Sequence, residues 1–282
     1  MTSESPSAGH TNSGGAAATP AGQPPFDVRV AHVARVYDYW LGGTDNFPAD
    51  RAAGDQAIAA YPDIVLSVRA NRAFLARAIG YLATEAGIRQ FLDIGTGIPT
   101  ANNTHEVAQA AAPDSRVVYV DKDPVVLAHA RSLLSSTPEG ATRYLDADLR
   151  DTGTILAQAA QTLDFTQPVA IVLMAILHLI GDQDDPYGIV STLTGAGPAG
   201  SYLALSHVAS DIDQRAVAEA REQVSSFMAV KQTYRNHAQV TRFFDGMEIV
   251  EPGIVKVSQW RPVSEAEAAT PSALWCGVGG KL

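Results

Sequence analysis

The chain has 282 residues, of which 46% are hydrophobic and 18% charged, a balance typical of a globular protein with a sizeable core. Its net charge of −10 argues against a nucleic-acid partner, because an acidic surface repels phosphate backbones. Cys276 is the only cysteine, so an internal disulfide and a cysteine-based zinc site are both excluded. The most apolar run, 169–180, is too short to cross a membrane. We therefore expect a cytoplasmic protein.

The first part of the chain contains no predicted strand. Residues 1–25 are mostly Ser, Gly, Ala, Thr and Pro, so we expect a disordered tail. Residues 26–87 are predicted to form a helical cap, in which 63–83 has apolar residues at helical spacing. Arg72 lies on that apolar stripe and requires an anion. The anion is either a nearby Asp or Glu, or the carboxylate of a ligand.

From residue 88 to 282 short apolar runs alternate with helical stretches. The alternation predicts a mainly parallel α/β sheet of seven strands, with helices on both faces. The predicted strands are 91–94, 117–120, 144–145, 169–173, 202–206, 248–257 and 274–278. The last two are joined by a segment around 252–271 in which we expect no helix, so they can form an antiparallel pair at one edge.

A glycine-rich turn follows the first predicted strand. It contains Asp93, Gly95, Thr96 and Gly97, and its glycines allow a ligand to approach the backbone closely. A nicotinamide dinucleotide site needs a third small residue, where this chain has Thr100. Asp93 would be poorly placed beside a pyrophosphate, but well placed beside the positive charges of S-adenosylmethionine (SAM). The turn therefore favours SAM over NAD.

The second and third strands also end in carboxylates. Asp121 is placed to accept hydrogen bonds from both hydroxyls of a ribose, with Lys122 beside it. Asp148 is placed to accept from the amino group of an adenine, and the N–H of Leu149 can donate to a ring nitrogen. Asp146 is the alternative acceptor. Together these positions predict a nucleoside site along one edge of the sheet.

The fourth strand leads to Ala175 and His178. Its end is the point at which open α/β sheets bind ligands, so Ala175 is predicted to touch the cofactor. His178 is either a general base or a structural histidine that packs the end of the strand. His207, after the fifth strand, is expected in the pocket of the molecule that would receive the methyl group of SAM. The histidines show no metal-ligand spacing, and we expect no metal.

Several segments resemble a bacterial family of SAM-dependent methyltransferases once catalogued only as a domain of unknown function. The match runs from about residue 28 to the C-terminus, although Trp40 and the end of the chain, 276–280, differ from the usual pattern. The segments are 34–47, 69–75, 91–99, 203–207, 242–246 and 260–262. The resemblance implies a Rossmann-like class I methyltransferase fold with an N-terminal helical cap. It implies no particular acceptor.

The cap segment 34–47 has its own chemistry. Tyr37 and Tyr39 offer aromatic faces that suit a sulfonium cation or a flat acceptor, although such rings can equally pack a helix on the sheet. Asn46 is predicted to join them at the substrate. Arg69 and Arg72 are candidates for the carboxylate of SAM, and Arg72 is the stronger one.

These observations predict a SAM-dependent methyltransferase that acts on a small molecule. Two alternatives are an NAD-dependent oxidoreductase and a SAM-binding module without catalytic activity. The sequence leaves the acceptor atom and the oligomeric state open.

Overall fold

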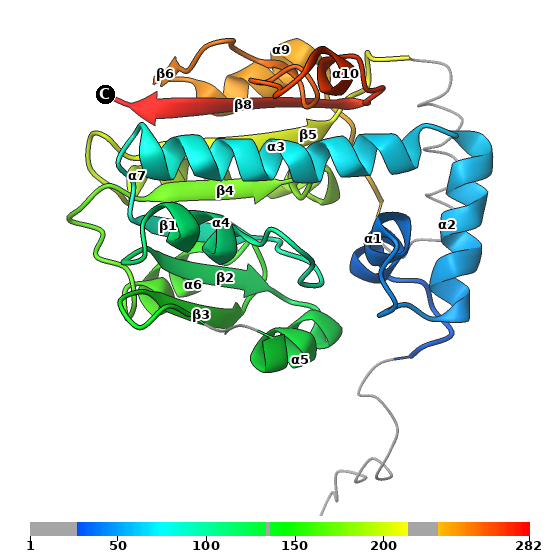
Figure 1. Ribbon diagram of the computed structural model, residues 1–282, viewed down its shortest axis with the longest axis horizontal. Coiled ribbons are helices and arrows are strands. Elements are labelled where there is room, and N and C mark those ends of the chain that lie inside the picture. Colours follow the sequence, from blue (N-terminus) through cyan, green and yellow to red (C-terminus); the bar gives the residue numbers. More distant parts are fainter. Residues whose placement is uncertain (1–26, 134–135, 214–230) are drawn as a thin grey trace, which may run out of the picture.

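The computed structural model describes residues 27–133, 136–213 and 231–282, so the tail predicted at 1–25 lies outside the described residues. An eight-stranded sheet forms its centre (Figure 1). The strands are β1 (Gln90–Ile94), β2 (Arg116–Asp121), β3 (Ala141–Asp146), β4 (Ala170–Met174), β5 (Tyr202–Val208), β6 (Met247–Ile249), β7 (Val255–Lys256) and β8 (Leu274–Lys281).

The strand order is β3-β2-β1-β4-β5-β8-β6, with β7 paired to β8. Strands β1 to β5 are parallel, whereas β8 is antiparallel to β5, β6 and β7. This confirms a mainly parallel sheet with an antiparallel edge. The chain runs outward from β1 to β3 on one side and from β4 to β5 on the other. The switch between β1 and β4 therefore opens a crevice at the carboxyl ends of the strands.

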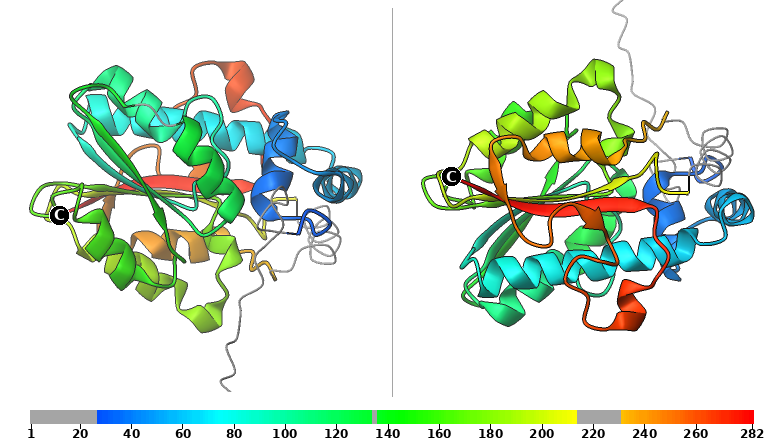
Figure 2. Two further views of the ribbon diagram at one scale, coloured as in Figure 1. Left: turned by 90° about the horizontal axis from the view of Figure 1, so that it is seen from below. Right: turned by 90° about the horizontal axis from the view of Figure 1, so that it is seen from above.

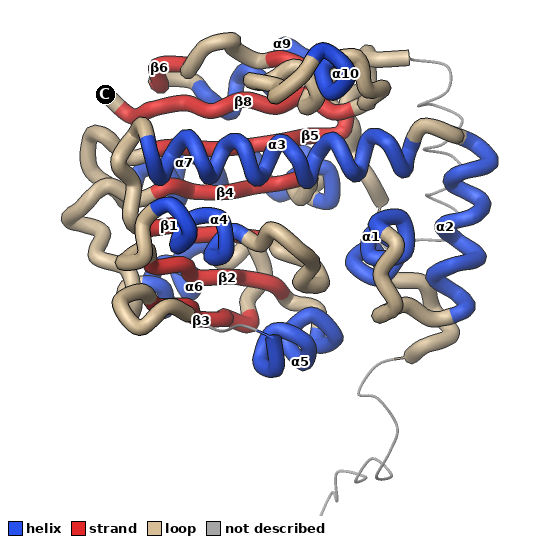
Figure 3. The backbone as a smooth tube through the Cα atoms, in the orientation of Figure 1, coloured by secondary structure: helices blue, strands red, loops and turns tan. Residues whose placement is uncertain are grey.

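The described sheet has eight strands, where the sequence predicted seven. The predicted strand 248–257 is divided into β6 and β7 by a turn at Pro252 and Gly253. Pro252 has no N–H for a strand ladder, and Gly253 has φ +95° and donates its N–H to the carbonyl of Val250. The segment 252–271 also contains a four-residue helix, α10 (Glu265–Ala268), where no helix was expected (Figure 3).

Helices cover both faces of the sheet (Figure 2). One face carries α3 and α4, and the other carries α6, α7 and α9. Besides α10, the helices of the described residues are α1 (Val33–Leu41), α2 (Pro48–Ala60), α3 (Ile64–Thr84), α4 (Thr104–Ala111), α5 (Pro124–Leu133), α6 (Thr152–Ala159), α7 (Pro186–Gly195) and α9 (His237–Thr241), and the 3-10 helices are η1 (Leu177–Leu179), η2 (Asp182–Asp184) and η3 (Arg242–Phe244).

Helix α3 matches the helix predicted at 63–83 closely. Its apolar stripe places Phe74, Ile79 and Leu82, all fully buried, in one cluster with Val117 and Val172 of the sheet. The helix lies along the face of the sheet in Figure 1. Most of α3 therefore belongs to the core of the sheet, although its sequence falls within the predicted cap of residues 26–87.

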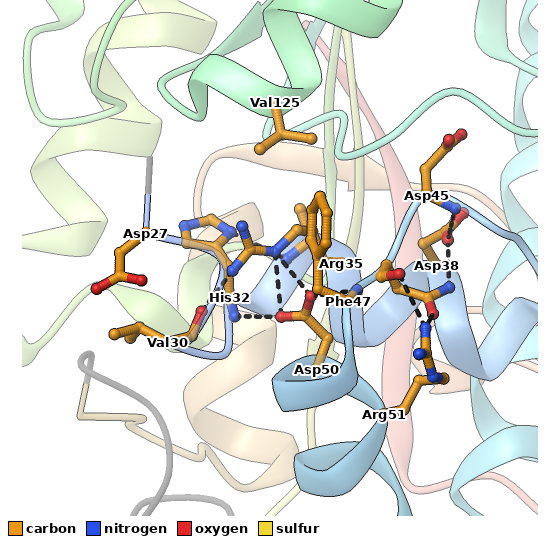
Figure 4. Close-up of polar contacts among 12 residues, drawn as sticks. Asp27, Val30, His32, Arg35, Asp38, Asp45, Phe47, Asp50, Arg51 and Val125 are labelled. Carbon is orange, nitrogen blue, oxygen red and sulfur yellow. Dashed lines mark hydrogen bonds and ion pairs between the residues drawn. The ribbon is translucent and has the colours of Figure 1, made fainter. Parts of the chain in front are cut away.

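Helices α1 and α2 lie beyond the carboxyl ends of the parallel strands (Figure 1). A buried ion pair joins them: Arg35 Nε lies 2.9 Å from Asp50 Oδ2, and the two side chains are 3% and 0% exposed. Asp50 also accepts from the N–H groups of His32 and Phe47 (Figure 4). Because a buried carboxylate needs several donors, this cluster fixes α1 against α2.

A second carboxylate orders the loop between the two helices. Asp38 Oδ2 accepts from the N–H of Asp45 at 3.0 Å and from Asn46 Nδ2 at 2.9 Å (Figure 4). A Cβ at Gly43 would collide with the Asp38 carboxylate, so only glycine fits there. Much of the distinctive segment 34–47 thus holds α1, α2 and the loop between them together.

Candidate active site

A cavity of about 160 Å³ lies at the carboxyl ends of β1, β2 and β4, bounded also by α1. We call it the first cavity. Eleven of the residues predicted from the sequence line it: Tyr37, Arg72, Asp93, Gly95, Thr96, Gly97, Asp121, Lys122, Asp148, Leu149 and Ala175. Their convergence follows from the parallel strands, whose carboxyl ends meet at one edge of the sheet.

The glycine-rich turn leaves its backbone open to this cavity. Gly95 and Gly97 have φ values of +77° and +67°, which side-chain-bearing residues rarely adopt. A Cβ at Gly95 would collide with Ile176, whereas the space beside Gly97 is open. The turn thus provides a cradle of backbone that a ligand can approach without meeting a side chain.

Asp93 is a buried acid in the wall of the first cavity. Its side chain accepts from Thr104 Oγ1 at 2.6 Å, and the residue is 4% exposed. Burial raises the pKa of its carboxyl group from 3.8 to about 6. A cation bound beside Asp93 would favour the ionised form, so the site is suited to a positively charged group.

Asp121 is held by backbone groups. Its Oδ2 accepts from the N–H of Gly97 and its Oδ1 from the N–H of Asp123, both at 2.9 Å. Burial raises the pKa of the Asp121 carboxyl group, although these hydrogen bonds oppose the shift. Each carboxylate oxygen accepts more than one hydrogen bond, so the oriented group retains capacity for hydroxyls in the cavity.

Asp148 is paired with two cationic side chains, Lys122 and Arg150. Lys122 Nζ donates to its Oδ2 at 3.0 Å, and Arg150 donates to the carboxylate through its backbone N–H at 2.9 Å and through Nη1 at 3.1 Å. Burial acts to raise the pKa of Asp148, but these donors hold it below its ordinary value. The alternative acceptor, Asp146, is exposed and does not line the cavity.

Arg72 has a different partner from the carboxylates expected. Its Nη2 donates to the carbonyls of Ala101 and Asn102, at 3.0 and 3.1 Å, in the loop that follows the glycine-rich turn. Carbonyl groups do not neutralise a guanidinium, so its charge remains available at the first cavity. Arg69, three residues earlier, is exposed and lies outside the lining.

A second cavity of about 110 Å³ adjoins the first. The two share Val33, Tyr37 and Ala175 in their walls. Ala175 has φ +50°, a strained value for a residue with a Cβ, at the point where β4 ends. The lining of the second cavity is Val33, Tyr37, Trp40, Tyr61, Ile64, Ser67, Val68, Ala175, His178, Val208, Gln232, Tyr234, Ala273 and Leu274.

His178 lies in the second cavity and not in the first. The residue is 6% exposed, and its buried Nδ1 has no hydrogen-bond partner among the described residues. Burial, assisted by the charge of Arg235, lowers the pKa of the imidazole to about 4. The ring is therefore neutral near pH 7 and able to accept a proton or a hydrogen bond.

His207 lines neither cavity, which corrects the expectation that it faces an acceptor. It is fully buried, with Nδ1 2.8 Å from the carbonyl of Val208 and Nε2 2.9 Å from Arg235 Nη1. Successive side chains of a strand point to opposite faces, and Val208 is the neighbour that reaches the second cavity. His207 is therefore a structural histidine.

Of the predicted site residues in the segment 34–47, one lines the cavities and two do not. Tyr37 lines both cavities, and its hydroxyl accepts from Asn71 Nδ2 at 3.0 Å. Tyr39 lines neither, because residues two apart on a helix face different directions; its hydroxyl donates to Asp55 at 2.6 Å. Asn46 is buried inside the cap, outside both cavities. Its predicted place at the substrate is thus not the observed one.

Several residues of the site were not predicted from the sequence. Gln232 and Tyr234 enter the second cavity from the segment before α9, and Ser67 enters it from α3. His32 lines the first cavity, and its Nδ1 lies 2.6 Å from Asp123 Oδ2, which links the cap to the end of β2. Isolated polar residues of this kind belong to no motif, so only their spatial placement identifies them.

Within the described residues, no three His, Cys, Asp or Glu side chains are grouped as a metal ion would require. No helix in the described part of the chain is long and apolar enough to span a membrane.

Comparison with known proteins identifies the family. A crystal structure of a DUF574 family protein from Streptomyces avermitilis MA-4680 is 46% identical, covers 91% of this chain and 99% of its own, and superposes with a TM-score of 0.88. A crystal structure from Thermobifida fusca YX is 38% identical over 93% of this chain and 99% of its own, with a TM-score of 0.84. No curated protein matches the chain.

The family model described as S-adenosyl methyltransferase matches residues 20–282, nearly the whole chain. This excludes the NAD-dependent oxidoreductase and agrees with the resemblance noted in the sequence. The chain therefore belongs to the S-adenosyl methyltransferase family, and SAM is its cofactor.

Proposed function

We propose that this protein transfers the methyl group of SAM to a small molecule held in the second cavity, in the cytoplasm. The observation that carries the proposal is the shared wall of the two cavities, formed by Val33, Tyr37 and Ala175. A ligand in the first cavity and a ligand in the second would contact each other at that wall. When bound, SAM supplies a methyl group attached to a positively charged sulfur.

The residues of the first cavity fit this cofactor. The buried carboxyl group of Asp93 would hold the ammonium group, and Asp121 would accept from the ribose hydroxyls. Asp148 and Leu149 would meet the adenine, with Lys122 keeping Asp148 in place. Arg72 would receive the carboxylate. The open backbone at Gly97 would admit the cofactor beside these groups.

His178 and Tyr37 are the residues that we assign to the acceptor. Neutral His178 would accept the proton of an O–H or N–H group as that group is methylated. Tyr37, held by Asn71, would position the acceptor at the shared wall. Holding two reactants in line can contribute up to about 7–11 kcal/mol to catalysis, so alignment would supply most of the rate.

We also propose that α1, α2 and the first turn of α3 act as the cap. Its contact with the sheet at His32 and Asp123 would keep Tyr37 over both cavities. Burial acts to raise the pKa of Asp123, but the hydrogen bond and charge of His32 hold that pKa below its ordinary value.

The test is a methylation assay with three classes of acceptor. The full chain is incubated with SAM in three separate arms, which contain a panel of small molecules, bulk RNA or a protein extract. The formation of S-adenosylhomocysteine (SAH) is measured in each arm. We expect turnover in the small-molecule arm, and strongly reduced turnover at limiting SAM concentration in Asp121→Ala. Turnover confined to RNA or protein, or equal in the Asp121→Ala variant, would overturn the proposal.

A further inference from the structure

The lining of the second cavity points to a class of acceptor. We propose that it selects a flat, uncharged aromatic molecule that carries one O–H or N–H group beside His178. The inference rests on the proposed function, since it assumes that the second cavity holds the acceptor.

Aromatic rings form much of this cavity, and their polar ends are already engaged. Trp40 Nε1 donates to the carbonyl of Gly54 at 3.2 Å, and the Tyr234 hydroxyl donates to Gln232 Oε1 at 2.6 Å. The Tyr61 hydroxyl lies 3.5 Å from Ser67 Oγ. The rings are thus left to contact a ligand through carbon, which favours a flat apolar partner.

The described lining of the second cavity also carries no formal charge near pH 7. None of the described residues that line it is Asp, Glu, Lys or Arg, and His178 is neutral near pH 7. A carboxylate or ammonium group placed there would lose its hydration without gaining an ion pair, which costs several kcal/mol. A charged acceptor is therefore disfavoured, although both signs of charge are present in the first cavity.

One polar atom in this lining still lacks a partner. Among the described residues of the second cavity, His178 Nδ1 is the buried side-chain polar atom with no hydrogen bond. Such atoms are costly in a folded protein unless a ligand or water satisfies them. A single O–H or N–H group on the acceptor would supply the hydrogen bond that this imidazole lacks.

Arg235 holds the residues around His178 in place. It is 1% exposed, and its Nη1 donates to the carbonyl of Leu177 at 3.0 Å and to His207 Nε2 at 2.9 Å. The His207 ring in turn lies 6.2 Å from the His178 ring, edge to face. The imidazole is therefore held by packing rather than by hydrogen bonds, which leaves its nitrogens for a ligand.

The size of the cavity is consistent with such a molecule. A cavity needs about 10–15 Å³ to hold one water, so a volume of about 110 Å³ accommodates a ligand of several heavy atoms. The space is small compared with a macromolecular substrate.

The experiment uses three probes with one ring system and different charge: 2-naphthol, 2-naphthoate and 2-naphthylmethylammonium. Binding to the full chain, saturated with SAH, is measured by calorimetry and by quenching of Trp40 fluorescence. We expect 2-naphthol to bind at least tenfold more tightly than either charged probe. Trp40→Phe should lose most of the quenching, which assigns the fluorescence signal to the second cavity.

A variant that fills the cavity tests the location. Ile64, in the first turn of α3, lines the second cavity alone and is partly exposed. Ile64→Trp should weaken 2-naphthol binding at least tenfold and leave SAH affinity unchanged. Ile64→Phe serves if the larger ring prevents folding, which circular dichroism would reveal.

The outcomes separate the inference from the proposed function. Equal or tighter binding of a charged probe, or 2-naphthol binding unaffected by both Ile64 variants, would overturn the choice of a neutral aromatic acceptor. Selective 2-naphthol binding together with methylation of RNA or protein alone would leave the cavity as described and overturn the proposed function instead.

Discussion

The two cavities share a wall and differ in almost every other respect. The first is formed mainly by the ends of β1, β2, β3 and β4, with acids and cations arranged around an open backbone. In the described residues, the second is lined mainly by rings and aliphatic side chains, with Ser67 and Gln232 as uncharged polar residues and no Asp, Glu, Lys or Arg. The contrast suggests how the fold divides its tasks. Fixed backbone and carboxylates would hold an invariant cofactor, whereas packed side chains would determine the acceptor.

The same contrast is visible in the acids and the histidine. Asp93 and Asp121 are positioned by hydrogen bonds to Thr104 and to the backbone. His178 is positioned by its surroundings and has an unpartnered nitrogen. Substitutions at these sites should therefore affect the two cavities separately, and the following measurements test that separation.

The largest effect is expected at His178. His178→Ala should lower turnover of a protic acceptor about 100-fold or more, because a positioned base contributes about 10²–10⁴-fold. SAH affinity by calorimetry should not change, since His178 lies outside the first cavity. A lower melting temperature with normal turnover would instead identify a structural histidine.

Asp121→Ala should weaken SAH about 100-fold. Two charge-assisted hydrogen bonds to ribose would be lost, each worth about 1.5–3 kcal/mol net, and the lower sum of about 3 kcal/mol corresponds to slightly more than 100-fold. Asp146→Ala is the matched control, because that acid ends the neighbouring strand and is exposed. Equal losses in the two variants, or weaker 2-naphthol binding in Asp121→Ala, would contradict the separation.

The pH dependence should differ between the cavities. The pKa of Asp93 is raised to about 6, so the carboxylate is ionised above that pH and protonated below it. A ligand ammonium needs the ionised form, and SAH affinity should fall about tenfold from pH 7 to pH 5. Binding of 2-naphthol should stay constant over this range, because the pKa of His178 is about 4.

Asp93→Asn gives the control for that titration. The amide cannot ionise, so SAH should bind more weakly at pH 7 and show little change down to pH 5. A tenfold decline that persists in Asp93→Asn would show that another group is responsible.

The smallest effects are expected in the cap. Tyr37→Phe removes a hydroxyl that bonds Asn71 and should weaken 2-naphthol about fivefold, the equivalent of about 1 kcal/mol. Tyr39→Phe should change binding less than about twofold, because surface substitutions usually stay within about 0.5 kcal/mol. A larger effect at Tyr39 would contradict its place outside both cavities.

The sequence was sufficient for features that depend on neighbours along the chain. Strand, glycine turn and acid follow one another between Asp93 and Gly97, and each parallel strand ends at the same edge. The order of residues therefore predicted the glycine turn and the strand-end acids of the first cavity. Helix α3 was predicted for the same reason, since its apolar spacing is local.

Predictions failed where the direction of a side chain decides whether a residue reaches a cavity. Tyr39 lies in the predicted helical region but turns toward Asp55. His207 was expected after a strand ending at residue 206, but it lies within β5 and packs against Arg235. A rotation of one residue on a helix or strand reverses such an assignment, and local patterns do not fix it where several faces are buried.

The sequence by itself determined the class of fold, the family and the cradle for the cofactor. Only the tertiary structure decided the second cavity, which joins Trp40, Ser67, His178, Gln232 and Ala273 from distant parts of the chain. No spacing rule relates residues so far apart. Their meeting depends on how the cap, α3 and the end of β5 pack together, because a cavity is a product of packing and not of order along the chain.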